Sequence, residues 1–489
     1  MNMHLRRFRN FLLLGGLFLI ARTALAATGG YEIKVRIVGL KDTICYLGNH
    51  YGDKQYVKDT VKVDNNGWMT FKGKEPLDGG IYLVILPNKT YFEILINDEQ
   101  RFTVETDTLD YVGHLKVTGS LENQLFSDHQ KYLIEKGRQN QDLRNRLDNN
   151  KNNKDSTELI KKQIAAIDKD VKQYRLKLVA DHPKTFMAKI ILTLQEPDVP
   201  EPPKDANGNV TDSTYQFRYF KSHFLENVDF SDERLLRTPI LYNKVKTYTQ
   251  QLTVPLPDSI IPSVDTIIIR SRANQEVFKY HVATLANYYE TSNIMGYDKV
   301  FVHIAENYYL TNEAYWADSA LKAKIRERVD KIKPNILGTP AHNLVMLDTN
   351  VQIKGNTIVP ESMRYKSLYD IKARYTILAF WDPTCSHCKV EVPELHHIYD
   401  SLKTKGVSIE VFAVGIESDP ELWKKFIREH NLDWINVTDP ANQTRFRDFY
   451  DIYSTPVIYL LDDQKRIIAK RLDPQKALDF ISRDLKEKK

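Results

Sequence analysis

The sequence predicts a multidomain protein with three parts: an N-terminal β-sandwich, an α-helical middle region and a C-terminal α/β region. Short segments in which apolar and polar residues alternate, separated by turn residues, predict the β-sandwich. Apolar residues at helical spacing predict the helical region, and predicted strands that alternate with predicted helices indicate the α/β region. The length of 489 residues agrees, because a domain averages roughly 150 residues. The 27% charged and 42% hydrophobic residues are typical of globular protein, which excludes general disorder and a polytopic membrane protein.

Residues 1–26 predict a secretory signal of the Sec type. They contain a basic start, an apolar stretch and a cleavage site of small residues, at Arg6–Arg9, Phe11–Ile20 and Ala24–Ala26. The apolar stretch is about half of the roughly twenty residues that a membrane span needs, so we expect no membrane span after cleavage. An uncleaved anchor is the alternative.

The net charge of +5 is mostly a property of this segment. Its four basic residues are not balanced by an acidic one, so the chain without it carries about +1. A nearly neutral protein has no general electrostatic attraction to DNA or RNA, and we expect no nucleic-acid partner.

The predicted β-sandwich covers residues 27–118. Residues 31–37 alternate between apolar and polar side chains, as a half-buried strand does, and turn signals recur through the region. The order of an Asp-rich turn, Gly67-Trp68 and the segment Gly80-Ile81-Tyr82 resembles a domain of unknown function that often opens thioredoxin-like envelope proteins of Gram-negative bacteria.

The predicted helical domain covers residues 119–333. An apolar stripe with alternating spacings of four and three indicates a helix, at Ile160, Ile164, Ile167, Val171, Tyr174 and Leu178. The polar stretch 149–156 separates it from a preceding helix, so we expect a helical hairpin, capped within Asp155–Glu158. The stripe is short, which favours a packing face over a dimerising coiled coil. The aromatic pairs Tyr288-Tyr289, Tyr308-Tyr309 and Tyr315-Trp316 are expected in the core rather than in a binding groove.

The predicted α/β domain covers residues 334–489. Its expected strands are Tyr375–Trp381, Val407–Gly415, Trp434–Val437, Pro456–Leu461 and Arg466–Lys470, with helices after Cys385, from Pro420 and at the C-terminus. This alternation predicts a sheet covered by helices.

The segment with recognisable chemistry contains Cys385-Ser386-His387-Cys388. A strand ends at Trp381, so Cys385 is expected where the next helix begins, and unpaired backbone N–H groups there lower a thiol pKa. Cys388 lies one turn later, within disulfide reach. Cys385 can therefore attack a disulfide and Cys388 can resolve the mixed disulfide.

Two other interpretations of this pair are weaker. A zinc site needs a second pair of ligands, and no second cysteine pair accompanies His387, His396 and His397. An inert structural disulfide fits poorly at a strand-to-helix turn. We therefore expect no metal and no cofactor other than the redox-active disulfide.

Residues 337–489 resemble the thioredoxin superfamily, and within it the envelope thiol reductants used in cytochrome c maturation. The motif Phe-Trp-x-x-x-Cys-x-x-Cys-Lys-x-Glu-x-Pro is matched from Phe380 to Pro393, and Thr455-Pro456 precedes a strand as in the family. The resemblance implies a cis proline at Pro456 that faces the two sulfurs. The residues that it implies for substrate contact are Trp381, His387, Thr455 and Pro456.

Two departures from cytoplasmic thioredoxins bear on mechanism. Ala379 stands where those proteins have a buried Asp, and the envelope reductases instead have a Glu at the position of Glu391. A carboxylate in a partly apolar site has a raised pKa, so Glu391 is the expected proton relay. His387 between the cysteines is similar to the arrangement in strongly oxidising members, and the direction of electron flow stays open.

The sequence thus predicts a periplasmic or cell-envelope thiol–disulfide oxidoreductase that acts on protein disulfides, with reduction preferred. A membrane electron donor would have to rereduce it. One alternative is a thiol peroxidase, although Pro383-Thr384-Cys385 lacks that pocket's spacing. The other is an envelope binding or accessory protein with a redox-sensing module. Cys45, in the β region, is expected to be a buried bystander.

Overall fold

The computed structural model describes residues 29–151, 153–354, 357–416 and 420–487. The predicted signal at residues 1–26 lies outside this part of the chain. Within it, no helix combines the length and the apolar character that a membrane crossing requires. The chain divides into two compact units. The first consists of the chain up to Gln195 together with the separate segment Arg234–Leu241, and the second consists of Glu196–Glu233 and Tyr242–Lys489. The predicted helical domain, residues 119–333, is therefore shared between the two units.

The first unit contains a β-sandwich of two four-stranded sheets. One sheet has the order β4-β1-β7-β8 and the other β3-β2-β5-β6. The alternating residues Ile33, Val35 and Ile37 are fully buried in a core that both sheets share, as the predicted period requires. The strands are β1 (Glu32–Val38), β2 (Ile44–Tyr51), β3 (Lys54–Lys62), β4 (Trp68–Lys72), β5 (Gly80–Ile85), β6 (Tyr91–Ile96), β7 (Arg101–Asp107) and β8 (Lys116–Thr118).

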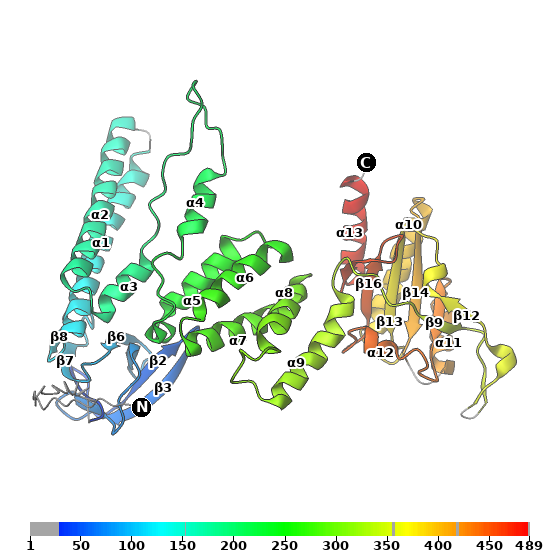
Figure 1. The fold of residues 1–489 in the computed structure, drawn as a ribbon, viewed down its shortest axis with the longest axis horizontal. Coiled ribbons are helices and arrows are strands. Elements are labelled where there is room, and N and C mark those ends of the chain that lie inside the picture. Colours follow the sequence, from blue (N-terminus) through cyan, green and yellow to red (C-terminus); the bar gives the residue numbers. More distant parts are fainter. Residues whose placement is uncertain (1–28, 152, 355–356, 417–419, 488–489) are drawn as a thin grey trace, which may run out of the picture. The chain divides into compact units, whose positions relative to one another are not determined.

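The same unit carries a long helical hairpin of α1 (Leu121–Asn149) and α2 (Lys154–Asp181), followed by α3 (Phe186–Leu194). The two long helices run side by side in Figure 1, and Tyr132 stacks on Tyr174 at 4.0 Å between ring centroids. The apolar stripe on α2 is thus a packing face within the chain. The cap differs from the prediction, because the side chain of Asn153 accepts from the Ser156 N–H at 3.1 Å.

The helices between α3 and the C-terminal sheet are short. The aromatic pairs lie only partly in the core: Tyr289 and Tyr308 are buried, Tyr309 and Trp316 are half-buried, and Tyr288 and Tyr315 are exposed. Core packing therefore explains the buried members of these pairs and not the exposed ones. The elements are α4 (Tyr215–His223), η1 (Glu233–Arg237), α5 (Pro239–Lys246), η2 (Thr247–Gln251), α6 (Pro257–Ser271), α7 (Gln275–Thr291), α8 (Tyr297–Ile304), η3 (Ala305–Tyr309), α9 (Ser319–Ile332) and η4 (Lys333–Asn335).

The C-terminal region of the second unit is a seven-stranded sheet with the order β12-β9-β15-β14-β13-β16-β17. Strands β13, β14 and β15 are parallel, and β16 runs antiparallel to β13. Its strands and helices are β9 (Val345–Asp348), β12 (Tyr365–Ser367), β13 (Tyr375–Trp381), α10 (Cys388–Thr404), β14 (Ile409–Gly415), α11 (Pro420–Glu429), β15 (Ile435–Thr438), α12 (Phe446–Phe449), β16 (Val457–Leu461), β17 (Ile467–Lys470) and α13 (Pro474–Glu487).

The sequence prediction missed several short elements of this region. They are β9, β12, α12, the small hairpin of β10 (Ile353–Lys354) and β11 (Thr357–Ile358), and the 3₁₀ turns η5 (Pro360–Ser362) and η6 (Leu368–Asp370). Each is too short to show a period. The predicted fold class is nevertheless confirmed in all three parts.

Strand β13 separates two cores, because helices cover both faces of the sheet. Ala379 and Trp381 face α10, α11 and α13, and the neighbouring Phe380 faces α12 on the other side. Every residue of β13 is buried, which explains why the strand appears in the sequence as a continuous apolar run. The rigid end of this strand positions the residues that follow it.

Candidate active site

The candidate site begins in the turn after β13. The Asp382 carboxylate accepts from the backbone N–H and the hydroxyl of Thr384, at 2.7 and 2.6 Å. Cys385 comes next, and its carbonyl already accepts from the N–H of Lys389 at 3.2 Å. The regular part of α10 starts at Cys388, three residues later than the predicted helix start. The Asp382 turn explains the difference, because its hydrogen bonds hold the chain outside the helical path.

Cys385 lies in an environment that favours the thiolate. A hydrogen bond from the Thr455 side chain and the backbone N–H groups of Cys388 and His387 lower the pKa of its thiol to about 7, although partial burial acts in the opposite direction. The protonated thiol can also donate to the Thr455 carbonyl oxygen at 3.3 Å. The nucleophilic thiolate of Cys385 is therefore more populated at neutral pH than that of an ordinary thiol.

Cys388 has the opposite properties. Its side chain is completely buried, and burial raises the pKa of its thiol to about 12. Its sulfur accepts from the backbone N–H of Asp382 at 3.4 Å. An accessible, acidic first thiol and a buried, protonated second thiol are the arrangement that stepwise disulfide exchange requires.

Thr455 and Pro456 form the opposite side of the site. The peptide bond between them is cis, and both residues are partly buried at the start of β16. Because β16 pairs with β13, the two segments meet although about seventy residues separate them along the chain. The structure thus brings Cys385, Cys388, Thr455 and Pro456 together.

Glu391 lies on the first turn of α10 and borders the same site. Partial burial is the main cause that raises the pKa of its carboxyl, and the nearby Asp473 acts in the same direction. Ala379, at the position where cytoplasmic thioredoxins carry the Asp, is 2% exposed between Ala413 and Ile458 of the adjacent strands. Glu391 lines a common cavity with Pro456, together with the carboxylates of Glu290, Asp451 and Asp473.

The other two predicted substrate-contacting residues differ from each other. His387 is exposed in the turn between the cysteines, where a substrate can reach it. Trp381 has no exposed surface and packs against Phe426 at 5.0 Å between ring centroids. We therefore correct its predicted role: Trp381 packs the core under the site, because side chains at the end of a strand covered by helices on both faces cannot reach solvent.

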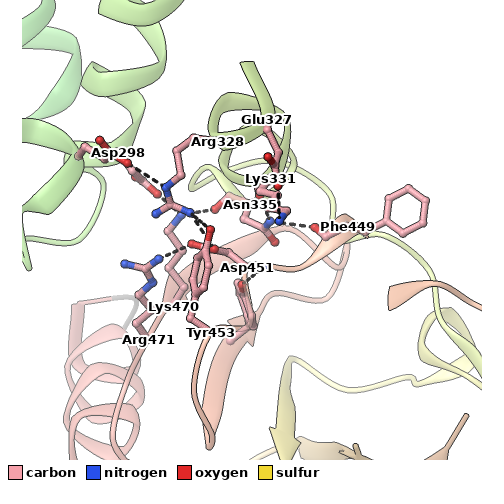
Figure 2. A network of polar contacts seen from close by, with 12 residues as sticks. Asp298, Glu327, Arg328, Lys331, Asn335, Phe449, Asp451, Tyr453, Lys470 and Arg471 are labelled. Carbon is pink, nitrogen blue, oxygen red and sulfur yellow. Dashed lines mark hydrogen bonds and ion pairs between the residues drawn. The ribbon is translucent and has the colours of Figure 1, made fainter. Parts of the chain in front are cut away.

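Sequence reasoning missed a network of charged residues behind the Pro456 loop, shown in Figure 2. Arg328 of α9 donates to Asp451 and to the Tyr453 hydroxyl, both at 3.0 Å, and Arg471 pairs with the other oxygen of Asp451. Asp451 is 6% exposed. The buried Asp451 carboxylate is thus neutralised by two guanidinium groups, of which Arg328 is the more buried. No local pattern in the sequence links residues so far apart.

A second group of contacts joins α8 and η4 to β17 and α12. The ammonium group of Lys470 pairs with Asp298 and donates to the Asn335 carbonyl, while the Asn335 amide donates to the Phe449 carbonyl at 2.8 Å. Helices α8 and α9 are thus fixed against β17 and the loop before Pro456 within the second unit (Figure 2).

The histidines considered for zinc do not extend the cysteine pair. Among the described residues, His396, Asp400 and Asp433 form a group close enough to share an ion, and neither Cys385 nor Cys388 belongs to it. His396 instead contacts Asp433 at 3.0 Å. Cys45 is completely buried in the sandwich, as predicted.

Comparisons with known proteins agree with this geometry. Residues 373–467 match a family model described as thioredoxin-like. Residues 31–126 and 148–335 match two models that are each described as a domain of unknown function.

Three of the relatives cover between 30% and 59% of this chain. The thiol-disulfide oxidoreductase ResA of a Bacillus cereus strain is 27% identical over 146 residues, which are 30% of this chain and 75% of that protein. The crystal structure of a domain of a possible thiol-disulfide isomerase from Cytophaga hutchinsonii is 42% identical and covers 31% of this chain and 95% of its own, with a TM-score of 0.27. A thioredoxin-like protein from Bacteroides caccae is 19% identical and covers 59% of this chain and 99% of its own, with a TM-score of 0.44.

The C-terminal region is therefore thioredoxin-like, as the sequence motif indicates. The predicted enzyme class, a thioredoxin-like thiol–disulfide oxidoreductase, is confirmed by the family match and the named relatives.

Proposed function

We propose that this thioredoxin-like oxidoreductase reduces disulfide bonds of protein substrates in the periplasm, with Cys385 as nucleophile and Cys388 as resolving thiol. One observation carries the proposal. The pKa of Cys385 is lowered to about 7 by hydrogen bonds, whereas burial raises that of Cys388 to about 12. Only the first thiol is ready to attack at neutral pH.

The reaction proceeds in two exchanges. The Cys385 thiolate attacks one sulfur of the substrate disulfide, that bond breaks, and the released substrate thiolate takes up a proton. Cys388 then loses its proton, attacks the Cys385 sulfur and releases the second substrate thiol. Two electrons pass to the substrate, and the enzyme retains a Cys385–Cys388 disulfide as its redox group.

Glu391 acts as the proton relay in the second exchange. Cys388 is buried and protonated, so its attack needs a base nearby, and the Glu391 carboxyl, whose pKa is raised mainly by burial, lies one turn further along α10. Thr455 and Pro456 hold the substrate chain against the Cys385 sulfur, and His387 borders it from the exposed turn.

The location and the electron donor are parts of the same proposal. The signal-like residues 1–26 support export to the periplasm or cell envelope. A reductant in that oxidising compartment is consumed at each turnover, so a membrane protein that passes electrons outward must rereduce the Cys385–Cys388 disulfide.

The test is reduction of insulin disulfides by the prereduced protein, combined with the reduction potential of the pair. We expect insulin reduction and a potential near the thioredoxin value of about −270 mV. The Cys388→Ser variant should accumulate a mixed disulfide with insulin, because the resolving thiol is missing. A potential near about −120 mV would reverse the proposed direction, and failure to form any mixed disulfide would exclude the mechanism.

A further inference from the structure

A cavity of about 560 Å³ opens beside Glu391 and Pro456, and two parts of the second unit line it. The α/β region contributes the active-site side, with Glu391, Pro456 and Lys476 among its residues. The helical region contributes the end of α7, the following loop with Asn293, and Arg328 of α9. The cavity beside Glu391 and Pro456 is therefore bordered on one side by helices outside the thioredoxin-like fold.

The contacts behind the cavity fix this helical wall. Arg328 binds Asp451 and Tyr453 of the loop that leads to Pro456, and its guanidinium also donates to Glu290 at the end of α7, at 3.1 Å. The same guanidinium thus connects the α7 side of the cavity with the loop before Pro456. Asp451 is 6% exposed, so a buried carboxylate holds the wall in one position.

The lining determines which ligands fit. Three of its residues are apolar (Pro456, Val457 and Leu472), and the others are polar or carry charges of both signs. A volume in the range of about 300–1,000 Å³ is typical of ligand sites, which are ordinarily mostly apolar. A cavity with so many hydrogen-bonding groups fits a polypeptide segment with its main-chain donors and acceptors better than an apolar small molecule.

We propose that the helical region supplies one wall of the substrate site, and that the cavity between Asn293 and Pro456 binds the polar polypeptide segment that flanks the substrate cysteine. This inference rests on the proposed function and adds a determinant of substrate class to it. The enzyme then favours disulfides in extended polar segments of a protein. Small disulfides do not reach the helical wall, so the wall adds nothing to their binding.

The test fills the cavity from the helical side. Asn293 is exposed, and Asn293→Trp places a bulky ring at the cavity without replacing a residue that contacts Cys385. We measure kcat/KM for insulin and for the small disulfide dithiodipyridine. The ratio of the two should fall about tenfold, which corresponds to about 1.4 kcal/mol of lost substrate binding. Lys324→Trp, on an exposed position of α9 that does not line the cavity, is the matched control and should leave the ratio unchanged.

A second variant tests the same wall without added bulk. Arg328→Gln removes the charge that holds Asp451, Tyr453 and Glu290, and the ratio should fall in the same direction. An unchanged ratio in Asn293→Trp, or an equal loss with both disulfides in both variants, overturns the proposed wall while leaving the proposed function intact. A wild-type protein that reduces neither disulfide would instead refute the proposed function, and the wall with it.

Discussion

The β-sandwich and the thioredoxin-like region each contain a cysteine and a partly buried glutamate, but the candidate active site lies in the thioredoxin-like region. Cys45 lies inside the sandwich, where burial raises the pKa of its thiol to about 11. Hydrogen bonds from Thr455 and from the backbone at the start of α10 instead lower the pKa of the Cys385 thiol to about 7. Burial also raises the pKa of the carboxyl groups of both Glu93 and Glu391. The residue types are the same in both regions. The thiol pKa values differ because N–H and O–H groups donate hydrogen bonds to the Cys385 sulfur, whereas burial dominates at Cys45.

Exchange of each cysteine for serine gives the largest expected contrast. Cys385→Ser should reduce the turnover of insulin disulfides by about 10⁴-fold or more, because the nucleophile is lost. Cys45→Ser should leave turnover within about twofold, since removing a buried thiol affects stability before it affects the site. Equal losses in the two variants would mean that Cys385 is not the attacking thiol.

The rates at which Cys385 and Cys45 react with an alkylating reagent compare the two thiols without relying on turnover. In a Cys388→Ser background, Cys385 should be alkylated by iodoacetamide at pH 7 on the order of 10³-fold faster than Cys45. The thiolate of Cys385 is more populated at that pH than that of an ordinary thiol, while Cys45 is both protonated and fully buried. The Cys385 rate should rise with pH and level off above pH 7, because its thiol pKa is lowered. A midpoint near pH 9, the value of an ordinary thiol, would contradict the assignment.

The two glutamates give a smaller contrast. Glu391→Gln should reduce turnover by about 10²-fold, since a positioned general base contributes at least that much. The loss should appear in the release of the mixed disulfide, measured by rapid acid quench, and not in its formation. Glu93→Gln is the matched control, because it neutralises a carboxyl of raised pKa in the sandwich and should leave both steps unchanged. Slower formation of the mixed disulfide in Glu391→Gln would argue against a proton relay.

Local patterns predicted most of the fold because periodicity is a local property. The strand β13 has the predicted bounds Tyr375–Trp381, and the hairpin of α1 and α2 breaks within the predicted polar stretch. Short elements such as β9 and α12 contain too few residues to show a period. The late start of α10 depends on the Asp382 turn, whose hydrogen bonds compete with the helix.

The sequence by itself determined the three-part organisation and the pair Cys385 and Cys388, because alternation, helical spacing and a Cys-x-x-Cys after a strand are all contiguous in the chain. Tertiary structure alone decided that Trp381 is buried, that Thr455 contacts Cys385, and that Arg328 of the helical region holds the loop before Pro456. The last two contacts join residues about seventy or more positions apart. Burial and electrostatics depend on which distant groups meet, and only packing of the whole second unit brings them together.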